Sequence, residues 1–218
     1  MIIAEPTHYG AGITLYGDYW DLRSLRDTIC HLAEGAPLSE NMSDFVLGLA
    51  DEIELACKKG KETRVFGDNE YDKVTYYGVA VVWPIFLFDV RVLHWSSRFR
   101  KLTKDHQADL YRLSACVEDA LTAFDPKVGK VCCQWFEQFS DLSEKYSTQF
   151  VSHIALNYID GGKPGKARFK KLPEFLHMLS PDSAEYKIFA EQMADIAKEN
   201  KCSPEDIDYV VEWPKFKW

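Results

Sequence analysis

Apolar side chains recur at intervals of three and four residues through most of the chain, and this periodicity constrains the fold more than any other feature. The clearest stripe is Leu110, Leu113, Val117, Leu121 and Phe124, which is followed by Asp125-Pro126. The same spacing predicts helices over residues 22–32, 46–57, 84–101, 128–139, 146–159, 167–179 and 183–200. Each stripe must be buried against a neighbour, so we expect these helices to pack together.

The first third of the chain also contains segments typical of strands. Residues 13–16 form a short β-type run between glycines, and residues 62–66 and 73–82 are two β-rich runs around a polar turn, which predicts a hairpin. The tail from residue 203 is a candidate for one further strand. We therefore predict an α+β fold that is mostly helical, with a small antiparallel sheet packed against about seven helices.

The domain organisation follows from the same pattern. No repeat of fixed period is present, and the glycine-rich loop 160–166 is the one plausible boundary. We expect a single domain over residues 1–218, with a sheet-containing part at about 1–83, a helical part at about 84–202 and a tail at 203–218.

Charge and terminal sequence limit the cellular setting. The 34 acidic residues outnumber the 26 basic ones and give a net charge of -8, which repels a phosphate backbone. Nucleic acid is therefore an unlikely partner, and binding it would require a local basic patch. The start of the chain lacks the basic and apolar regions of a signal peptide. The longest apolar run, residues 76–88, is shorter than the ~20 residues of a bilayer span. We expect a soluble, cytoplasmic protein that does not associate with a membrane.

A basic, glycine-rich loop at residues 161–171 is the most distinctive local feature. Its five basic side chains are Lys163, Lys166, Arg168, Lys170 and Lys171. They stand at the start of a predicted helix, where backbone amides bind anions. Asp160 and Ala167 occupy positions where a phosphate loop needs Gly and Ser or Thr, so that motif is absent. The loop is either a solvated surface, which we favour, or a site for a phosphorylated ligand or nucleic acid.

Glu174 and His177 have the Glu-x-x-His spacing of helical metal sites, and no other predicted helix contains such a pair. A helical di-iron site needs that pair twice with two more carboxylates, so we expect no metal and no cofactor. We expect His94, His106 and His153 to be structural. The six cysteines, at positions 30, 57, 116, 132, 133 and 202, follow no C-x-x-C pattern and are expected to be reduced, mostly buried thiols.

No catalytic signature is present in the chain. Gly-x-Ser-x-Gly and the kinase, zinc-protease and dinucleotide motifs are all absent. Cys30, which is followed by His31, is the candidate for a catalytic nucleophile. Asp18 and Asp21 flank a strand-to-helix turn, where helix capping explains them. Whether the protein is an enzyme with an unrecognised site stays open.

Aromatic residues make up 14% of the chain, and two groups lie outside the helical stripes. One surrounds the first turn, and the other is the tail Trp213–Trp218, which is costly to leave in water and should dock on its own domain or on another subunit. With no catalytic motif present, we favour a non-catalytic interaction or scaffold protein that forms a homo-oligomer, with another protein as a possible partner. The alternatives are the anion-binding role of the basic loop and an enzyme.

Residues 12–29 and 77–84 carry a resemblance to known proteins. In these segments, Gly-Ile-Thr-Leu-Tyr-Gly-Asp-Tyr-Trp-Asp-Leu-Arg-Ser-Leu-Arg-Asp-Thr-Ile and Tyr-Gly-Val-Ala-Val-Val-Trp-Pro, the chain resembles a family of uncharacterised bacterial proteins. The resemblance covers about the first half and implies a bacterial, intracellular origin. It implies no activity and no site residues.

Overall fold

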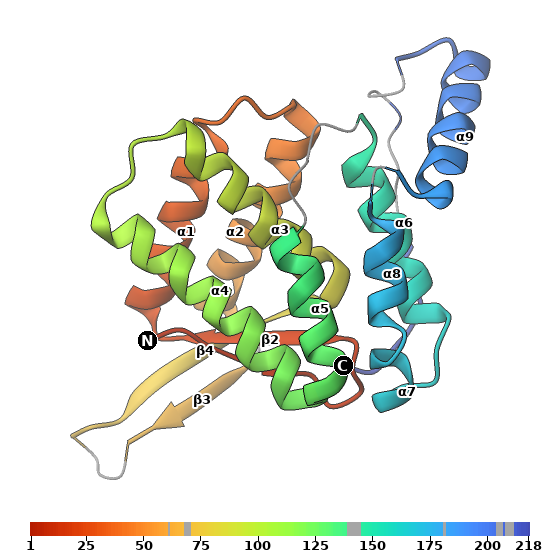
Figure 1. Ribbon diagram of the computed structural model, residues 1–218. Coiled ribbons are helices and arrows are strands. Elements are labelled where there is room, and N and C mark those ends of the chain that lie inside the picture. The colour runs from red at the N-terminus through yellow and green to blue at the C-terminus, as the bar shows by residue number, and fades with distance from the viewer. Residues whose placement is uncertain (61, 68–70, 139–144, 181, 204–206, 208–211) are drawn as a thin grey trace.

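The computed structural model describes residues 1–60, 62–67, 71–138, 145–180, 182–203, 207 and 212–218. A four-stranded sheet lies along one side of the molecule, and helices cover one of its two faces (Figure 1). The expectation of an α+β fold with a small antiparallel sheet is confirmed.

The strands are β1 (Ile3–Pro6), β2 (Gly12–Gly17), β3 (Thr63–Phe66) and β4 (Val74–Val82), in the spatial order β1-β2-β4-β3 with every neighbouring pair antiparallel. Side chains alternate between the two faces of a strand. Ile13 and Leu15 of β2 therefore enter the helix-side core, where both are fully buried, whereas Thr14 and Tyr16 lie on the opposite, open face. Tyr16 pairs with Gly78 of β4.

Helices α1 (Tyr19–Ala33) and α2 (Glu40–Lys59) pack side by side against the sheet. The side chain of Asp18 accepts hydrogen bonds from the backbone amides of Trp20 and Asp21, and Ser39 caps α2 in the same way. Gly60, in the left-handed conformation, ends α2, as glycine does at many helix ends. The capping interpretation of Asp18 is thus correct.

Helix α3 (Trp83–Ser96) is the central element of the helical layer and continues into the short 3-10 helix η1 (Ser97–Phe99). Most of its residues are buried, because it contacts α1, α2, α4, α6, α8 and the sheet. A helix buried all round is apolar on every side, which explains why residues 83–96 show an almost continuous apolar run.

The second half is a series of helices: α4 (Lys104–Phe124), α5 (Pro126–Gln138), α6 (Ser147–Asp160), α7 (Lys166–Phe169), α8 (Leu172–Met178) and α9 (Ala184–Asn200). Helix α4 contacts β1, and α5 packs on α4 and α8. Helix α9 stands at the outer end of this series (Figure 1). One continuous cluster of buried apolar residues runs from Ile2 to Met193.

The structure differs from the expectations at two elements. Strand β1 was not predicted, because Glu5 and Pro6 interrupt any apolar alternation in its four residues. The single helix expected over 167–179 is two, since Pro173 stands in the first turn of α8 and a proline suits a helix start rather than an interior. The candidate strand in the tail falls mainly on residues 204–206 and 208–211, which lie outside the described part of the chain, and residues 212–218 form no strand. Within that part, none of the helices combines the length and the apolar character required to cross a bilayer.

Candidate functional site

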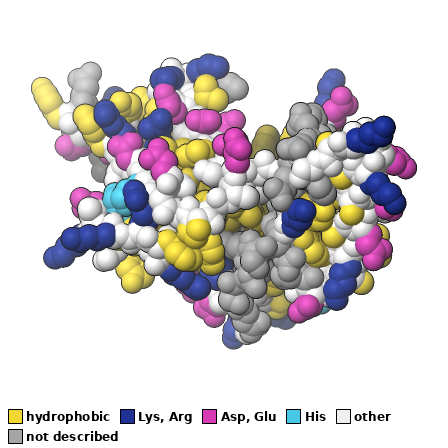
Figure 2. All heavy atoms as spheres, turned by 90° about the horizontal axis from the view of Figure 1, so that it is seen from above, with side chains coloured by type: hydrophobic (Ala, Val, Ile, Leu, Met, Phe, Trp, Pro, Cys, Tyr) yellow, Lys and Arg dark blue, Asp and Glu magenta, His cyan; other side chains and the backbone are white. Residues whose placement is uncertain are grey.

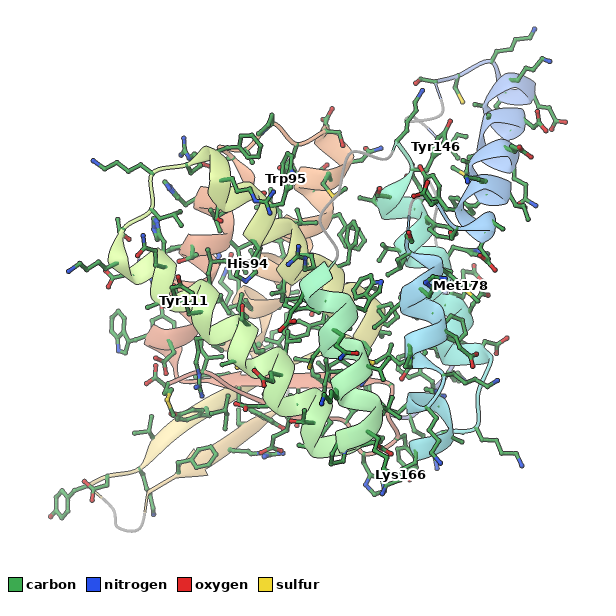
Figure 3. The ribbon with its side chains drawn as sticks, viewed as in Figure 1. His94, Trp95, Tyr111, Tyr146, Lys166 and Met178 are labelled. Atoms are coloured by element: carbon green, nitrogen blue, oxygen red, sulfur yellow. The ribbon has the colours of Figure 1, made fainter. Side chains whose placement is uncertain are left out.

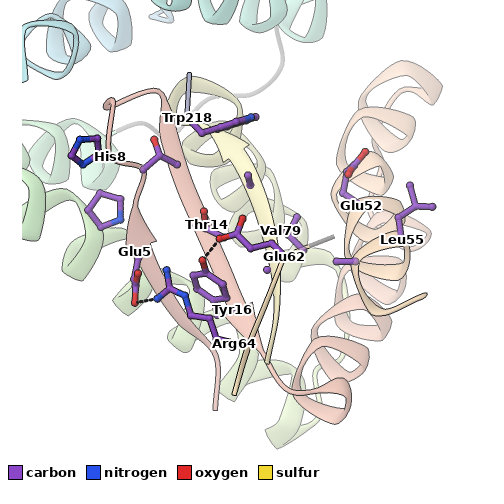
Figure 4. A pocket seen from close by; sticks show the side chains of 15 residues that line it. Glu5, His8, Thr14, Tyr16, Glu52, Leu55, Glu62, Arg64, Val79 and Trp218 are labelled. Atoms are coloured by element: carbon purple, nitrogen blue, oxygen red, sulfur yellow. Dashed lines mark hydrogen bonds and ion pairs between the residues drawn. The ribbon is translucent and has the colours of Figure 1, made fainter. Parts of the chain in front are cut away.

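A cavity of about 720 Å³ opens on the uncovered face of the sheet, between β1, β2, β4, α2 and the tail (Figure 4). The side chains that give it its chemistry are Glu5, Thr14, Glu52, Glu62, Arg64 and Trp218. The volume lies within the ~300–1,000 Å³ of small-molecule sites.

The floor of the cavity depends on the cross-strand pair Tyr16 and Gly78. Tyr16 is 1% exposed although it lies on the open face. A Cβ atom on Gly78 would lie 2.8 Å from Tyr16 Cε1, 3.0 Å from Thr14 Cγ2 and 3.2 Å from Glu62 Cγ. Three side chains therefore converge over residue 78. They can do so because glycine has no side chain of its own to fill that space.

Polar contacts fix the tyrosine ring in place. Its hydroxyl donates a hydrogen bond to Glu62 Oε1, and the Arg64 guanidinium lies 4.2 Å from the ring centroid. Burial, together with the hydrogen bond to Glu62 and its charge, raises the pKa of Tyr16 to about 12. The phenol thus stays protonated at neutral pH and remains a donor.

Arg64 links β3 to β1 across the open face. Its guanidinium Nη1 donates to Glu5 Oε1 at 2.6 Å, while its plane covers Tyr16. The hydrogen bond to Glu5 raises the pKa of Arg64. Arg64 is therefore already paired, whereas the other cavity carboxylates, Glu52 and Glu62, form no ion pair with a described residue.

The basic loop is only partly a surface feature. Arg168 is buried, and its guanidinium donates to the carbonyl oxygens of Ile159 at 3.0 Å and Tyr9 at 3.3 Å. Lys171 Nζ donates to the Gly161 carbonyl at 2.9 Å. Two of the five predicted anion ligands therefore hydrogen-bond to backbone carbonyls of the fold.

The other three predicted ligands, Lys163, Lys166 and Lys170, are exposed. Lys166 marks the start of α7, at the opposite end of the helical column from α9 (Figure 3). Lys166 and Lys170 are among the groups that lower the pKa of Asp125, after its backbone hydrogen bond from Val128. Figure 2 shows the upper face, away from this loop, where acidic and basic side chains are interspersed. Anion binding by this loop stays a prediction.

The remaining candidates are separated in the fold. Burial raises the pKa of the Cys30 thiol, and the rings of His31 and His106 contact each other, with centroids 4.4 Å apart and an interplanar angle of 35°. No group of three or more His, Cys, Asp or Glu residues that could hold a metal occurs within the described ranges. The six cysteines are all free thiols.

His94 forms a close pair with Ser114, with 2.7 Å between Nε2 and Oγ. The Ser114 hydroxyl also lies 3.1 Å from the Leu110 carbonyl oxygen, so its one proton has two possible acceptors, and the tautomer of His94 sets the direction of the pair. Burial, with Arg91 and Arg98 nearby, lowers the pKa of His94. The pair joins α3 to α4.

Sequence reasoning did not identify the cavity residues Glu5, Thr14, Glu62 and Arg64. They come from three separate strand segments, so no local motif joins them. The available signal was the alternation of β2, which places Thr14 and Tyr16 on the same face, combined with a glycine inside the β4 run.

The fold and the cavity define an α+β protein whose antiparallel sheet has one helix-covered face and one open face that bears a polar cavity. The chain belongs to the family described as Domain of unknown function (DUF6904), whose model matches residues 2–218. No curated protein and no solved structure matches the chain. The expectation that it belongs to an uncharacterised family is confirmed.

Proposed function

We propose that the protein is a non-catalytic interaction protein that associates with a second copy of itself through the outer edge of β3. Strand β3 is the last strand of the sheet, and the β3–β4 hairpin extends away from the helical body (Figure 1). All four residues of β3 are exposed. An edge strand of this kind presents unpaired backbone groups to any further strand.

The opposite edge of the sheet is covered. Arg112 of α4 donates a hydrogen bond to the carbonyl oxygen of Ile2, and the Cys116 thiol lies 3.9 Å from the same oxygen. Helix α4 therefore covers the β1 edge. Among the described residues, no strand pairs with the outer edge of β3, which favours this edge for self-association.

Apolar side chains on the hairpin add to this edge. Val65 is 61% exposed, Phe66 and Val74 are more than 40% exposed, and Tyr71 is almost fully exposed. Such side chains favour removal from water, by about 25 cal/mol for each Å² buried. An exposed hydrophobic edge strand is a surface on which two chains pair.

Charge and symmetry favour a second copy as the occupant. Two identical chains carry -8 each and repel at long range, but in the described hairpin residues 62–67 and 71–74 the two basic side chains Arg64 and Lys73 match the two acids Glu62 and Asp72 in number. The hairpin is therefore a place where two copies can meet with little repulsion. Antiparallel pairing of β3 with itself about a two-fold axis would continue the all-antiparallel sheet.

The basic loop supports the phosphorylated-ligand role less well, because Arg168 and Lys171 are engaged with backbone carbonyls. An enzymatic role has the cavity as its one supporting feature. Both remain alternatives to self-association.

Sedimentation velocity across a hundredfold concentration range tests the proposal. The wild type should shift from monomer to dimer, and Val65→Lys should remain monomeric because it places a charge on the pairing surface. Val131→Lys is the matched control, since Val131 is 48% exposed on α5, away from the hairpin. A wild type that stays monomeric throughout, or a Val65→Lys variant that dimerises as well as Val131→Lys, would overturn the proposal.

A further inference from the structure

Thr14 occupies an unusual position on the open face of the sheet. Thr14 is 7% exposed and lines the cavity, and its side chain points into the cavity (Figure 4). Its hydroxyl forms no hydrogen bond with any residue of the described ranges. The hydroxyl faces the cavity and is therefore available to a ligand bound there.

Glu62 presents a carboxylate at the same place. Glu62 Cγ and Thr14 Cγ2 both lie within 3.2 Å of the point that a Cβ on Gly78 would occupy, so the two side chains border the same space. The carboxylate accepts the Tyr16 hydroxyl through Oε1, and Oε2 is left to accept another donor. A bound group here would meet one neutral hydroxyl and one anionic oxygen.

The net charge of the cavity lining determines whether a cationic or an anionic ligand is favoured. Its lining contains three carboxylates, Glu5, Glu52 and Glu62, and one guanidinium, that of Arg64. Arg64 is paired with Glu5, whereas Glu52 forms no hydrogen bond or ion pair with a described residue. Two negative charges are thus uncompensated, and an anion would be repelled.

The other walls are suited to an alkyl group. Leu55 and Ala56 of α2 and the Trp218 side chain line the cavity, and Trp218 is 42% exposed. An indole face attracts cations as well as apolar groups. The cavity therefore combines a carboxylate and hydroxyl end with an apolar and aromatic end.

We propose that this cavity binds a small organic ammonium ion, with the ammonium between Glu62 and Thr14 and the alkyl chain against Leu55 and Trp218. An ammonium has three donors and no acceptor, which matches a carboxylate oxygen and a hydroxyl that can accept. The lysine side chain of a peptide has the same chemistry as a free alkylamine, and the test separates these two sources.

Isothermal titration of the full chain with cadaverine is the direct test, since one of its two ammonium groups suits Glu62 and Thr14 and the other uncompensated carboxylate of the lining, Glu52, is available to the second. The neutral and anionic ligands of similar length are n-pentanol and pentyl phosphate. Cadaverine should bind, more weakly as salt rises, and the other two should not. A short Gly-Lys-Gly peptide with blocked ends forms the second arm. Peptide binding equal to that of cadaverine would support the ammonium site and identify a lysine side chain as its source.

Variants locate the binding in the cavity. Thr14→Val and Glu62→Gln keep the size of the side chains, and each should weaken cadaverine binding about tenfold, as expected for the loss of one hydrogen bond to a charged group. Thr75→Val on the hairpin and Glu118→Gln on α4 are matched controls at exposed positions and should bind as the wild type does. Circular dichroism verifies that each variant is folded.

Three results would overturn the site: no heat with millimolar cadaverine, tighter binding of pentyl phosphate than of cadaverine, or unchanged affinity in both folded Thr14→Val and folded Glu62→Gln. Because Val65 does not line the cavity, the Val65→Lys variant should keep its affinity for cadaverine. Self-association and ligand binding can therefore fail independently.

Discussion

The ring of Tyr16 lies over Gly78, its direct partner across the β2–β4 ladder, and fills the space that a side chain at position 78 would need. An aromatic side chain next to a strand glycine supplies the packing that the glycine lacks. Gly78 is thus required by the position of Tyr16 and not by a positive φ angle.

Gly78→Ala should destabilise the protein by about 1–3 kcal/mol, the usual cost of overpacking, because its Cβ would lie 2.8 Å from Tyr16 Cε1. Urea unfolding at neutral pH measures the loss. Gly48→Ala in α2 is the control, since a Cβ there meets nothing within 4 Å. It should leave the stability unchanged or raise it by up to ~1 kcal/mol through helix propensity. Equal stability of the two variants would contradict the packing role of Gly78.

Asp89 predicts a specific pH dependence of stability. It is 2% exposed in the middle of α3, its Oδ1 has no hydrogen-bond partner among the described residues, and burial raises its pKa well above the usual value. The folded state therefore holds a proton that the unfolded state releases above a pH of about 4. Stability should fall as pH rises from that point to the folded pKa, by up to ~1.4 kcal/mol per pH unit.

Asp89→Asn should remove this fall, because an amide does not ionise. Urea unfolding of wild type and variant from pH 4 to pH 8 measures it. Asp119→Asn, at an exposed position of α4, should retain the wild-type slope. A slope that persists in Asp89→Asn would assign the pH dependence to other groups.

Arg168 should contribute to stability more than to binding. Arg168→Met keeps much of the side-chain length but leaves the Ile159 carbonyl without its guanidinium donor, which should cost about 1–3 kcal/mol. Lys166→Met, at an exposed position two residues earlier, should change stability by less than ~0.5 kcal/mol. Thermal unfolding compares the two variants. Similar melting temperatures would show that the buried guanidinium bonds add little.

Thiol reactivity should follow burial. Cys202 is exposed, whereas burial raises the pKa of Cys116 to about 11 and that of Cys132 to about 12. Because the thiolate is the reactive form, iodoacetamide should label Cys202 first and leave Cys116 and Cys132 unmodified until the protein unfolds. Peptide mass spectrometry reads the order of labelling. Early modification of Cys132 would indicate local opening of α5.

The helices were predictable because each one buries a stripe, as Leu110, Leu113 and Val117 do in α4. The hairpin was predictable from its two β-rich runs. Strand β1 was not, since its place depends on pairing with β2 rather than on its own residues. The role of Arg168 was also hidden, because its carbonyl partners on Tyr9 and Ile159 become neighbours only in the folded chain.

Tyr9 joins three distant segments through its backbone. Its amide donates to the Trp218 carbonyl at 3.1 Å, and its carbonyl accepts from the Gly165 amide at 2.7 Å. Anything appended after Trp218 would therefore begin at the rim of the cavity. A histidine tag placed there would bring its imidazoles close to the cavity carboxylates, and a tag on the hairpin would obstruct the β3 edge. The position of the tag therefore decides which of the two surfaces stays free to bind a partner in a pull-down experiment.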